Sequence, residues 1–516
     1  MGADYLLGID VGTFGSKGVL VDVHGRILAS AFVEHGEESP RTGWYEQDAD
    51  AVWWGDLIKI TGRLVGTVPG GAGSVAAVGV SAVTPDVLPV DARGNALRRA
   101  ILYSDTRAAS QAKRMVEVLG QDAILATCGN ALSVQSAGPR LLWLRENEPD
   151  LFWRAHKIMD APAFLVHRLT GTFCADRSSI GAYHPFMNIR TLEWDEAICA
   201  EFGVPVDKLP ELRWSTDIVG SVTRAAAAAT GLVEGIPVIA GAGDGIAEMV
   251  SVGPEHEGEA ALLYGTTMVL VTLTRRLRPH PKVITLAGPL PGTYVSGAYM
   301  NTSAALSRWF RDNLGQVERR LEAQLGINAY QLLSSDAAEV PPGSAGLVVL
   351  PYFAGEGYPI LDEQARGLIL GLTLTHTRKH VYRALLEGVA YGLRHNWETI
   401  LSAGVNITRI RAVGGGTKSA VWTQIISDVI GQDQELVASH LGAPYGDAYL
   451  AGLGIGMFRD LSTLHEEWVR TIGVVKHRPE IKPVYDSYYA VYKELYPPLA
   501  DSMHTLARIS VEPVNV

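Results

Sequence analysis

The sequence predicts an α/β protein built from two similar domains, and three observations lead to that fold class. Segments typical of strands alternate with segments typical of helices along the 516 residues. A strand, a glycine-containing turn and a second strand occur together twice, near the start of each half of the chain. With 47% hydrophobic residues, a chain of this length has enough apolar material for more than one core.

The first half opens with a β-meander. Residues 5–9 form an apolar strand, and Asp10-Val-Gly-Thr-Phe-Gly-Ser-Lys17 is expected to be a glycine-rich turn leading into a strand over residues 18–23. A third strand is expected over residues 27–32. The other elements expected in this half are a buried strand over residues 75–83 and helices over residues 141–146, 164–169 and 225–229.

The second half begins with a similar hairpin. Residues 260–264 run into Gly265-Thr266-Thr267, and a second strand follows over residues 268–273. The clearest helix covers residues 380–400, because apolar residues recur there every four positions on one face. The other elements expected here are strands over residues 347–350 and 407–413, a helix over residues 420–430 and a terminal helix over residues 484–506.

A polar, proline-containing stretch over residues 253–259 marks the expected domain boundary. It separates a glycine loop at the end of the first half from the second hairpin. We therefore expect one domain over residues 1–253 and another over residues 254–516. Asp244 lies near the end of the first domain and is expected to face a cleft.

Composition excludes several classes of protein. The net charge of −11 and the lack of a clustered basic face argue against nucleic-acid binding. No apolar stretch reaches the roughly 18 residues of a spanning helix, so no membrane partner is expected. The first residues lack the basic region of a signal peptide. Three scattered cysteines fit neither a disulfide framework nor a metal site, and they favour a reducing, cytoplasmic location.

The stretch PVIAGAGDGIAE, residues 237–248, places Asp244 inside a glycine loop. Its glycines do not have the G-x-G-x-x-G spacing of a dinucleotide fold, and an ionised Asp would repel a phosphate at a helix N-terminus. Asp244 is therefore expected to face a neutral ligand or to accept a proton. The alternative is that it only caps the helix that follows.

Three glycine-containing motifs suggest phosphate binding. In the first turn, Gly12 and the hydroxyl groups of Thr13 and Ser16, with Lys17, offer donors to phosphate oxygens. Asp10 offers the oxygen ligand that Mg²⁺ prefers. The second hairpin offers a similar turn, and Gly414-Gly-Gly416 before a helix allows close backbone approach. A tight hairpin explains any one of these alone, but their order is more specific, and a P-loop sequence is absent.

These motifs resemble those of the FGGY carbohydrate kinases, in the actin-like ATPase superfamily. Gly8-Ile-Asp10-Val-Gly-Thr13 and Gly265-Thr266-Thr267 resemble the family's two phosphate motifs, and residues 412–416 resemble its adenosine motif. The most specific match is Gly367-Leu-Ile-Leu-Gly371-Leu followed, after seven residues, by His380-Val-Tyr-Arg-Ala-Leu-Leu-Glu387. Residues 136–144 resemble a further signature, with Arg140 where Lys is usual. The resemblance covers roughly residues 5–460.

The resemblance implies two actin-like domains of ribonuclease H-type topology with ATP and sugar in the cleft. Asp244 matches the family's catalytic base, which takes the proton of a sugar hydroxyl during phosphoryl transfer. Asp10 is then the Mg²⁺ ligand. The ATP-binding residues implied are Gly12, Thr13, Ser16, Lys17, Gly265, Thr266, Thr267, Gly415, Gly416 and Ser419.

The sugar itself is less closely defined. Residues 102–107 and 141–149 favour a xylulose-kinase-like subgroup, which implies conversion of D-xylulose to D-xylulose 5-phosphate. Thr84-Pro85-Asp86 departs from the sequence usual in that subgroup. These three residues are expected either to contact sugar hydroxyls or to form a proline turn that closes a strand. Another pentulose, a pentitol, a tetritol or glycerol stays open as the substrate.

A second class of function is also open: an actin-like regulator that binds ATP or sugar without catalysis, or a chaperone-type ATPase. Asp10, Thr13, Asp244, Gly265 and Thr266 are all present, which favours an active kinase. A chaperone needs a long substrate-binding extension, and none is expected after residue 460. A homodimer is a possible assembly.

Overall fold

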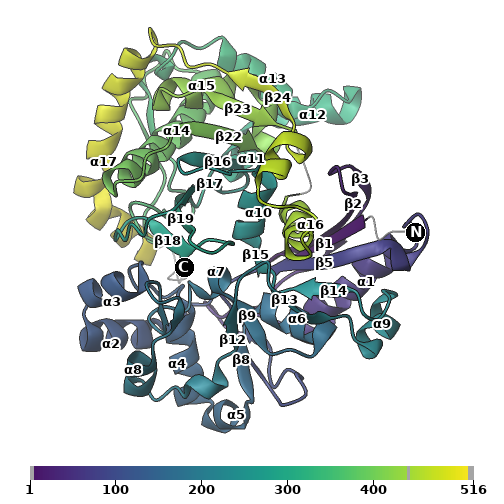
Figure 1. The fold of residues 1–516 in the computed structure, drawn as a ribbon. Helices are drawn as coiled ribbons and strands as arrows, with labels where there is room; N and C mark the ends of the chain where they lie inside the picture. Colours follow the sequence, from purple (N-terminus) through teal and green to yellow (C-terminus); the bar gives the residue numbers. More distant parts are fainter. Residues whose placement is uncertain (1–4, 439–441, 510–516) are drawn as a thin grey trace. The chain divides into compact units, whose positions relative to one another are not determined.

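The structure is a computed structural model that describes residues 5–438 and 442–509. The chain separates into two compact units (Figure 1). Unit 1 comprises Met1–Glu255, Leu273–Val295 and His440–Arg470, and unit 2 comprises His256–Thr272, Ser296–Ser439 and Thr471–Val516. The first break in the chain falls within the expected boundary stretch, and unit 1 also takes two later segments. The division into domains at residues 253 and 254 stays a prediction.

Unit 1 is built on a sheet with the strand order β13-β14-β5-β1-β2-β3, and β15 also pairs with β5. Strand β2 is antiparallel to β1 and β3, whereas β5 is parallel to β1, β14 and β15. The strands are β1 (Tyr5–Val11), β2 (Gly15–Asp22), β3 (Ile27–Glu34), β5 (Val75–Ala82), β13 (Ile218–Ser221), β14 (Pro237–Ile239) and β15 (Ala242–Gly243).

Unit 2 repeats this arrangement, with neighbouring strands in the order β19-β17-β16-β22-β23-β24. Strand β17 is antiparallel to β16, and β16, β22 and β23 are parallel. This confirms the repeat expected from the two hairpins. The strands are β16 (Glu259–Tyr264), β17 (Met268–Thr274), β19 (Tyr294–Met300), β22 (Arg409–Val413), β23 (Gln434–Val437) and β24 (Thr471–Val475).

Helices cover both faces of the sheet in unit 1. Helix α16 (Ala443–Gly454) lies across β1 and β5, beside α10 (Asp244–Val252) (Figure 1). Helix α1 (Gly55–Val65) packs on β2 and β3 from the other face. The remaining helices of this unit are α2 (Ala109–Leu119), α3 (Gln121–Cys128), α4 (Ala137–Asn147), α5 (Pro149–Arg154), α6 (Ala161–Thr170), α7 (Arg177–Ile180), α8 (Glu196–Glu201) and α9 (Arg224–Thr230).

In unit 2, the long helix α14 (Arg378–Ser402) confirms the clearest helix predicted from the sequence. It packs against α15 (Ala420–Ile430), and the terminal helix α17 (Lys482–Ile509) packs against both (Figure 1). The other helices of this unit are α11 (Ala304–Leu314), α12 (Gln316–Leu325) and α13 (Ala329–Ala338). Short strand pairs complete the fold: β4 (Glu46–Gln47) with β7 (Ala100–Ile101), β6 (Leu88–Val90) with β8 (Lys157–Met159), β9 (Cys174–Asp176) with β12 (Glu211–Arg213), β10 (Met187–Asn188) with β11 (Glu193–Trp194), and β20 (Val348–Leu350) with β21 (Leu368–Leu370).

The first hairpin differs from its prediction. Asp10 belongs to β1 and Lys17 to β2, where they face each other in the antiparallel register. Only residues 12–14 form the turn. The strands extend further than the glycines suggested because each added residue pair makes ladder hydrogen bonds.

All three cysteines are buried free thiols. Among the described residues, no helix has both the length and the apolar character that a membrane crossing requires.

Candidate functional site

The C-terminal ends of three parallel strands meet at one edge of the unit 1 sheet. Asp10 in β1 is level with Ser81 in β5, and Gly243 at the end of β15 is level with Ala82. Asp244 follows directly as the first residue of α10. The carboxyl ends of parallel strands are where α/β folds commonly bind ligands. The topology therefore brings Asp10 and Asp244, which are 234 positions apart in sequence, to one place.

Asp10 is held between charged and polar neighbours. On one side lies Lys17 of β2, and on the other lies Ser81 of β5, whose hydroxyl is 3.0 Å from Asp10 Oδ1. Asp10 is buried, with 6% of its surface exposed. Burial raises the pKa of Asp10, repulsion by Asp244 raises it further, and Lys17 and Ser81 partly offset both effects.

Asp244 is half-buried at the start of α10. Burial raises the pKa of Asp244 to about 6; the Gly245 backbone N–H, 2.7 Å from Oδ1, lowers it, and Glu248 one turn along the helix raises it. A carboxyl group with a pKa near neutrality is suited to proton transfer. The N-cap residue of α10 is Gly243, and no side chain caps this helix end. The structure therefore does not place Asp244 in the capping position.

Thr84, Pro85 and Asp86 follow β5 at the same edge of the sheet. Thr84 and Pro85 are half-buried, whereas the carboxyl group of Asp86 is fully buried. Neither carboxyl oxygen of Asp86 makes a hydrogen bond within the described residues. Burial raises the pKa of Asp86 well above its ordinary value, and the nearby Arg140 partly offsets the effect. The structure does not test whether these residues contact a sugar.

Arg140 supports this turn from inside the protein. Its guanidinium group is fully buried and donates hydrogen bonds to the backbone oxygens of Tyr103 and Pro85, both at 2.8 Å. Tyr183 donates to the backbone oxygen of Asp86. These bonds hold residues 84–86 in place. Arg140, noted in the sequence where the family usually has Lys, thus contacts the candidate sugar-binding turn.

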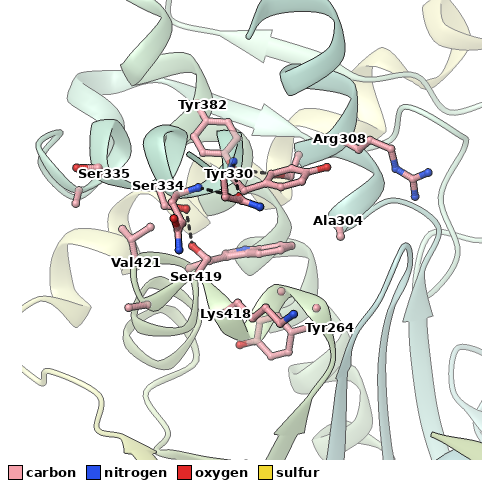
Figure 2. Close-up of a pocket in the computed structure, with 18 of the residues that line it drawn as sticks. Tyr264, Ala304, Arg308, Tyr330, Ser334, Ser335, Tyr382, Lys418, Ser419 and Val421 are labelled. Atoms are coloured by element: carbon pink, nitrogen blue, oxygen red, sulfur yellow. Dashed lines mark hydrogen bonds between the residues drawn. The ribbon is translucent and has the colours of Figure 1, made fainter. Parts of the chain in front are cut away.

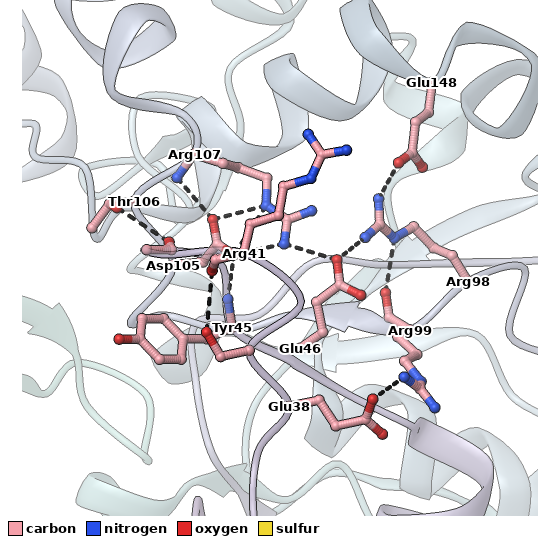
Figure 3. A network of polar contacts seen from close by, with 12 residues as sticks. Glu38, Arg41, Tyr45, Glu46, Arg98, Arg99, Asp105, Thr106, Arg107 and Glu148 are labelled. Carbon is pink, nitrogen blue, oxygen red and sulfur yellow. Dashed lines mark hydrogen bonds and ion pairs between the residues drawn. The ribbon is translucent and has the colours of Figure 1, made fainter.

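The segment that contains Asp105 and Arg107 forms an internal network (Figure 3). The Arg107 guanidinium group is fully buried and forms ion pairs with Asp105 at 2.7 Å and Glu46 at 2.8 Å. It also lies over the Trp44 ring, 3.7 Å from the ring centre. These contacts give Arg107 and Asp105 a role in holding unit 1 together, and none of them points to a ligand.

Residues of the predicted first turn that belong to β2 divide between the two sides of the sheet. Lys17 lies on the side of Asp10, but the adjacent Ser16 points the other way and donates to the buried Asp56 at 3.1 Å. Thr13 is half-buried in the turn itself, next to Gly12. The structure therefore brings Gly12 and Lys17 close to Asp10 and does not bring the Ser16 hydroxyl there. A place for Thr13 beside Asp10 stays a prediction. A phosphate contact by Ser16 stays a prediction.

Unit 2 contains a pocket of about 950 Å³ between α11, α13 and α15 (Figure 2). Tyr330 and Tyr382 lie on one side of it, and Tyr264 and Lys418 lie on the other. Ser334 and Ser419 share a hydrogen bond of 3.0 Å in its wall. A largely apolar pocket with a few hydroxyl groups suits a flat, partly polar ligand. The other lining residues are Gly265, Thr266, Ala304, Ser307, Arg308, Asn328, Gln331, Ser335, Ala338, Gly415, Gly416, Ala420, Val421 and Trp422.

The sequence motifs predict the turns that line this pocket but not the aromatic side chains of its walls. Gly265, Thr266, Gly415, Gly416 and Ser419, all predicted, are among the residues that line it, and Thr267 is not. Tyr330, Tyr382 and Trp422 were missed. They lie in ordinary amphipathic helices or at their ends, where an aromatic residue most often belongs to the core.

Asp447 on α16 is another site residue that the sequence motifs do not indicate. Its Oδ2 lies 2.7 Å from the Ser81 hydroxyl, which also contacts Asp10. The link from residue 447 back to residue 81 depends on α16 joining the sheet of unit 1. Nothing in the local sequence around Asp447 indicates that contact.

Comparison with known proteins places this fold and site in a family. The N-terminal domain of the FGGY family of carbohydrate kinases matches residues 5–251, and its C-terminal domain matches residues 260–455. Among related proteins, the xylulose kinase of Bacillus subtilis (strain 168) is 28% identical over 495 residues, 95% of this chain and 96% of its own. A gluconokinase from the same organism is 27% identical over 454 residues, 87% and 88% of the two chains.

Among solved structures, the xylulose kinase from Rhodospirillum rubrum aligns with a TM-score of 0.88 and 29% identity, covering 97% of this chain and all of that one. The actin-like, two-domain α/β fold expected from the resemblance is thereby confirmed. Both halves of the sequence and both sheets of the structure agree on one assignment. The chain belongs to the FGGY family of carbohydrate kinases.

Proposed function

We propose that this kinase transfers the γ-phosphoryl group of ATP to a hydroxyl group of D-xylulose, giving D-xylulose 5-phosphate, with Asp244 as the general base. The observation that carries the chemistry is the half-buried Asp244 at the strand ends that also hold Asp10. The choice of sugar is supported by relatives named xylulose kinase that match nearly the whole chain.

In this mechanism Asp244 acts on a poor nucleophile. Its ionised carboxyl group takes the proton of the sugar hydroxyl as the hydroxyl oxygen bonds to the γ-phosphorus and the bond to ADP breaks. Burial raises the pKa of Asp244 to about 6, so the group is ionised at neutral pH and yet basic enough to accept the proton. The proton then passes from Asp244 to solvent.

Asp10 fits the role of a Mg²⁺ ligand. It is a buried carboxyl group whose pKa is raised by burial and by repulsion from Asp244, and a cation would offset both effects. Among the described residues, no group of three or more His, Cys, Asp or Glu side chains is arranged to hold a metal. Asp10 would therefore share the ion with water and phosphate oxygens, as Mg²⁺ sites in kinases commonly do. Bound there, Mg²⁺ would offset the negative charge of the phosphates.

The pocket in unit 2 suits the adenosine part of ATP. Tyr330, Tyr382 and Trp422 offer aromatic surface to the base, and the backbone at Gly415 and Gly416 can approach it closely. Phosphate contacts are proposed for Gly12, Thr13, Lys17, Thr266 and Thr267. The three free cysteines fit the cytoplasmic location that we expect.

The test is ADP release measured with a panel of acceptors: D-xylulose, D-ribulose, D-gluconate, glycerol and an alditol. We expect sugar-stimulated turnover with the highest kcat/KM for D-xylulose. If kcat/KM for gluconate, glycerol or the alditol exceeds that for both ketopentoses, D-xylulose is the wrong substrate, but the assignment as a kinase still holds. ATP hydrolysis that no acceptor stimulates would instead favour a chaperone-type ATPase or a regulator.

A further inference from the structure

A buried acidic residue on α16 contacts the strands that carry the candidate metal ligand. Asp447 is fully buried, and its Oδ2 lies 2.7 Å from the Ser81 hydroxyl oxygen. The same hydroxyl oxygen lies 3.0 Å from Asp10 Oδ1. Ser81 is also fully buried, so the hydroxyl joins two carboxyl groups in a place that bulk water does not reach. Neither the family motifs nor the proposed mechanism gives Asp447 a role.

Helix α16 is seated too closely on the sheet for this contact to be incidental. A β-carbon on Gly8 would lie 1.8 Å from the Pro444 backbone oxygen, and one on Gly79 would lie 2.2 Å from that of Asp447. Gly8 and Gly79 lie two positions before Asp10 and Ser81, so all four face α16. Only glycine at these positions lets the helix approach. The fold therefore fixes Asp447 relative to the strand that carries Asp10.

The number of protons sets the direction of the two hydrogen bonds. A serine hydroxyl has one proton, so Ser81 can donate to only one of the two carboxyl groups. The second bond needs a proton from a carboxyl group. Asp447 is the better candidate, because Asp10 must be ionised to hold Mg²⁺ and Asp447 is the more deeply buried of the two. Burial raises the pKa of Asp447 well above its ordinary value, and repulsion by Asp10 adds to the effect.

We propose that Asp447 is a positioning residue for the metal site. As a neutral acid it donates a hydrogen bond to Ser81, and Ser81 in turn donates to Asp10. The chain of two bonds holds the Asp10 carboxyl group in one orientation. Partners that orient metal-ligating carboxyl groups in this way typically change metal affinity or activity 10–100-fold when they are removed. The inference rests on the proposed role of Asp10 as the Mg²⁺ ligand.

The test uses Mn²⁺ as a probe of the Mg²⁺ site in the full-length chain with ADP. Its dissociation constant is measured by electron paramagnetic resonance, beside kcat and the melting temperature. We expect Asp447→Ala and Ser81→Ala each to weaken Mn²⁺ binding about 10–100-fold. We expect Asp447→Asn to stay within about threefold of the wild type, because its amide N–H group can replace the donor.

A double variant separates positioning from general loss of packing. Because both residues act through one chain of bonds, Asp447→Ala with Ser81→Ala should be no worse than the weaker-binding single variant. Tyr449→Phe is the matched control. It removes a hydrogen bond from the same helix to the Asp460 backbone oxygen at 2.7 Å, so it should lower the melting temperature and leave the Mn²⁺ affinity unchanged.

Three results would overturn the inference: Asp447→Asn as poor as Asp447→Ala, wild-type Mn²⁺ affinity in Asp447→Ala, or losses that add in the double variant. If Asp447→Ala does not fold, Ser81→Ala and Asp447→Asn decide, because the first must lose affinity and the second must keep it. Asp10→Asn is the reference for the proposed function. If it leaves Mn²⁺ affinity unchanged, the metal role of Asp10 fails. If it weakens binding while Ser81→Ala does not, only the positioning role fails.

Discussion

Units 1 and 2 share one strand order, yet the same place in the two sheets carries opposite chemistry. In unit 1, Asp10 of β1 is level with Ser81 of the parallel neighbour β5. In unit 2, Leu263 of β16 is level with Val413 of the parallel neighbour β22. Both Asp10 and Leu263 lie two residues before a Gly-Thr turn. The repeated topology thus keeps the turn and exchanges a polar pair for an apolar one.

This difference separates two tasks. Unit 1 gathers carboxyl groups with raised pKa values, which suit proton transfer and cation binding. Unit 2 has a pocket lined by aromatic side chains and glycines, which suits a nucleoside. The repeat therefore supplies the framework in both units, while a few side chains at the strand ends decide between chemistry and binding.

The largest effect is expected from removing the base in unit 1. In Asp244→Asn the amide cannot take the proton of the sugar hydroxyl, so kcat should fall about 10²–10⁴-fold. Folding should change little, because Asn has nearly the same size and no cap is lost. Rates at saturating ATP and sugar, with a melting curve on the same preparation, check both expectations. If the melting temperature drops and kcat does not, Asp244 has a structural role and is not the general base.

A smaller effect is expected from the aromatic wall in unit 2. Tyr330→Ala removes a ring from the pocket, so the KM for ATP should rise about tenfold, the equivalent of roughly 1.4 kcal/mol. The value of kcat should stay nearly constant, because no charged group of unit 1 changes. Tyr330→Phe keeps the ring and is the matched control. If Tyr330→Ala changes kcat and leaves the KM for ATP alone, the binding role of this pocket is wrong.

The pH dependence of the reaction should be set by unit 1 alone. The base acts in its ionised form, and burial raises the pKa of Asp244 to about 6. The ionised fraction therefore falls as the pH drops below 6. At saturating Mg²⁺, which would hold Asp10 ionised, kcat/KM for the sugar should fall about tenfold per pH unit there, with a plateau above. With an unburied Asp as the base, kcat/KM would stay unchanged down to about pH 4. A plateau that extends to pH 4.5 would contradict the assignment.

The smallest expected effect is a shift of that acid limb. Lys17 lowers the pKa of both Asp10 and Asp244. Lys17→Met removes the cation, so the pKa of Asp244 should rise and the acid limb of the kcat/KM profile should move to higher pH. The informative quantity is the midpoint of the limb, whatever happens to the maximal rate. A midpoint that stays in place or moves to lower pH would show that Lys17 does not act on this group.

Much of the fold follows from local sequence. The two hairpins and the helix over Arg378–Ser402 have strong periodic or turn signals, and the structure contains them. The first turn was predicted too long, because the pairing of Asp10 with Lys17 across β1 and β2 is a tertiary choice that glycines nearby do not reveal. Helix α16 is an element that we did not predict.

The candidate site was only partly predictable for the same reason. Asp10 and Asp244 stand in glycine motifs whose chemistry can be argued from residue types. Asp447 reaches Ser81 only because α16 returns to the sheet of unit 1, and Tyr330 reaches the unit 2 pocket only through helix packing. Such contacts depend on topology, and a single sequence gives no local signal for them.

The most direct test of the separation between units is ATP binding by Asp244→Asn, measured by isothermal titration calorimetry on the preparation whose kcat is determined. We predict a dissociation constant for ATP within about threefold of the wild type, beside a kcat lowered at least a hundredfold. That result would show that unit 1 carries the chemistry and that nucleotide binding does not depend on Asp244. A kcat close to the wild type, or an ATP affinity weakened as much as kcat, would contradict the account.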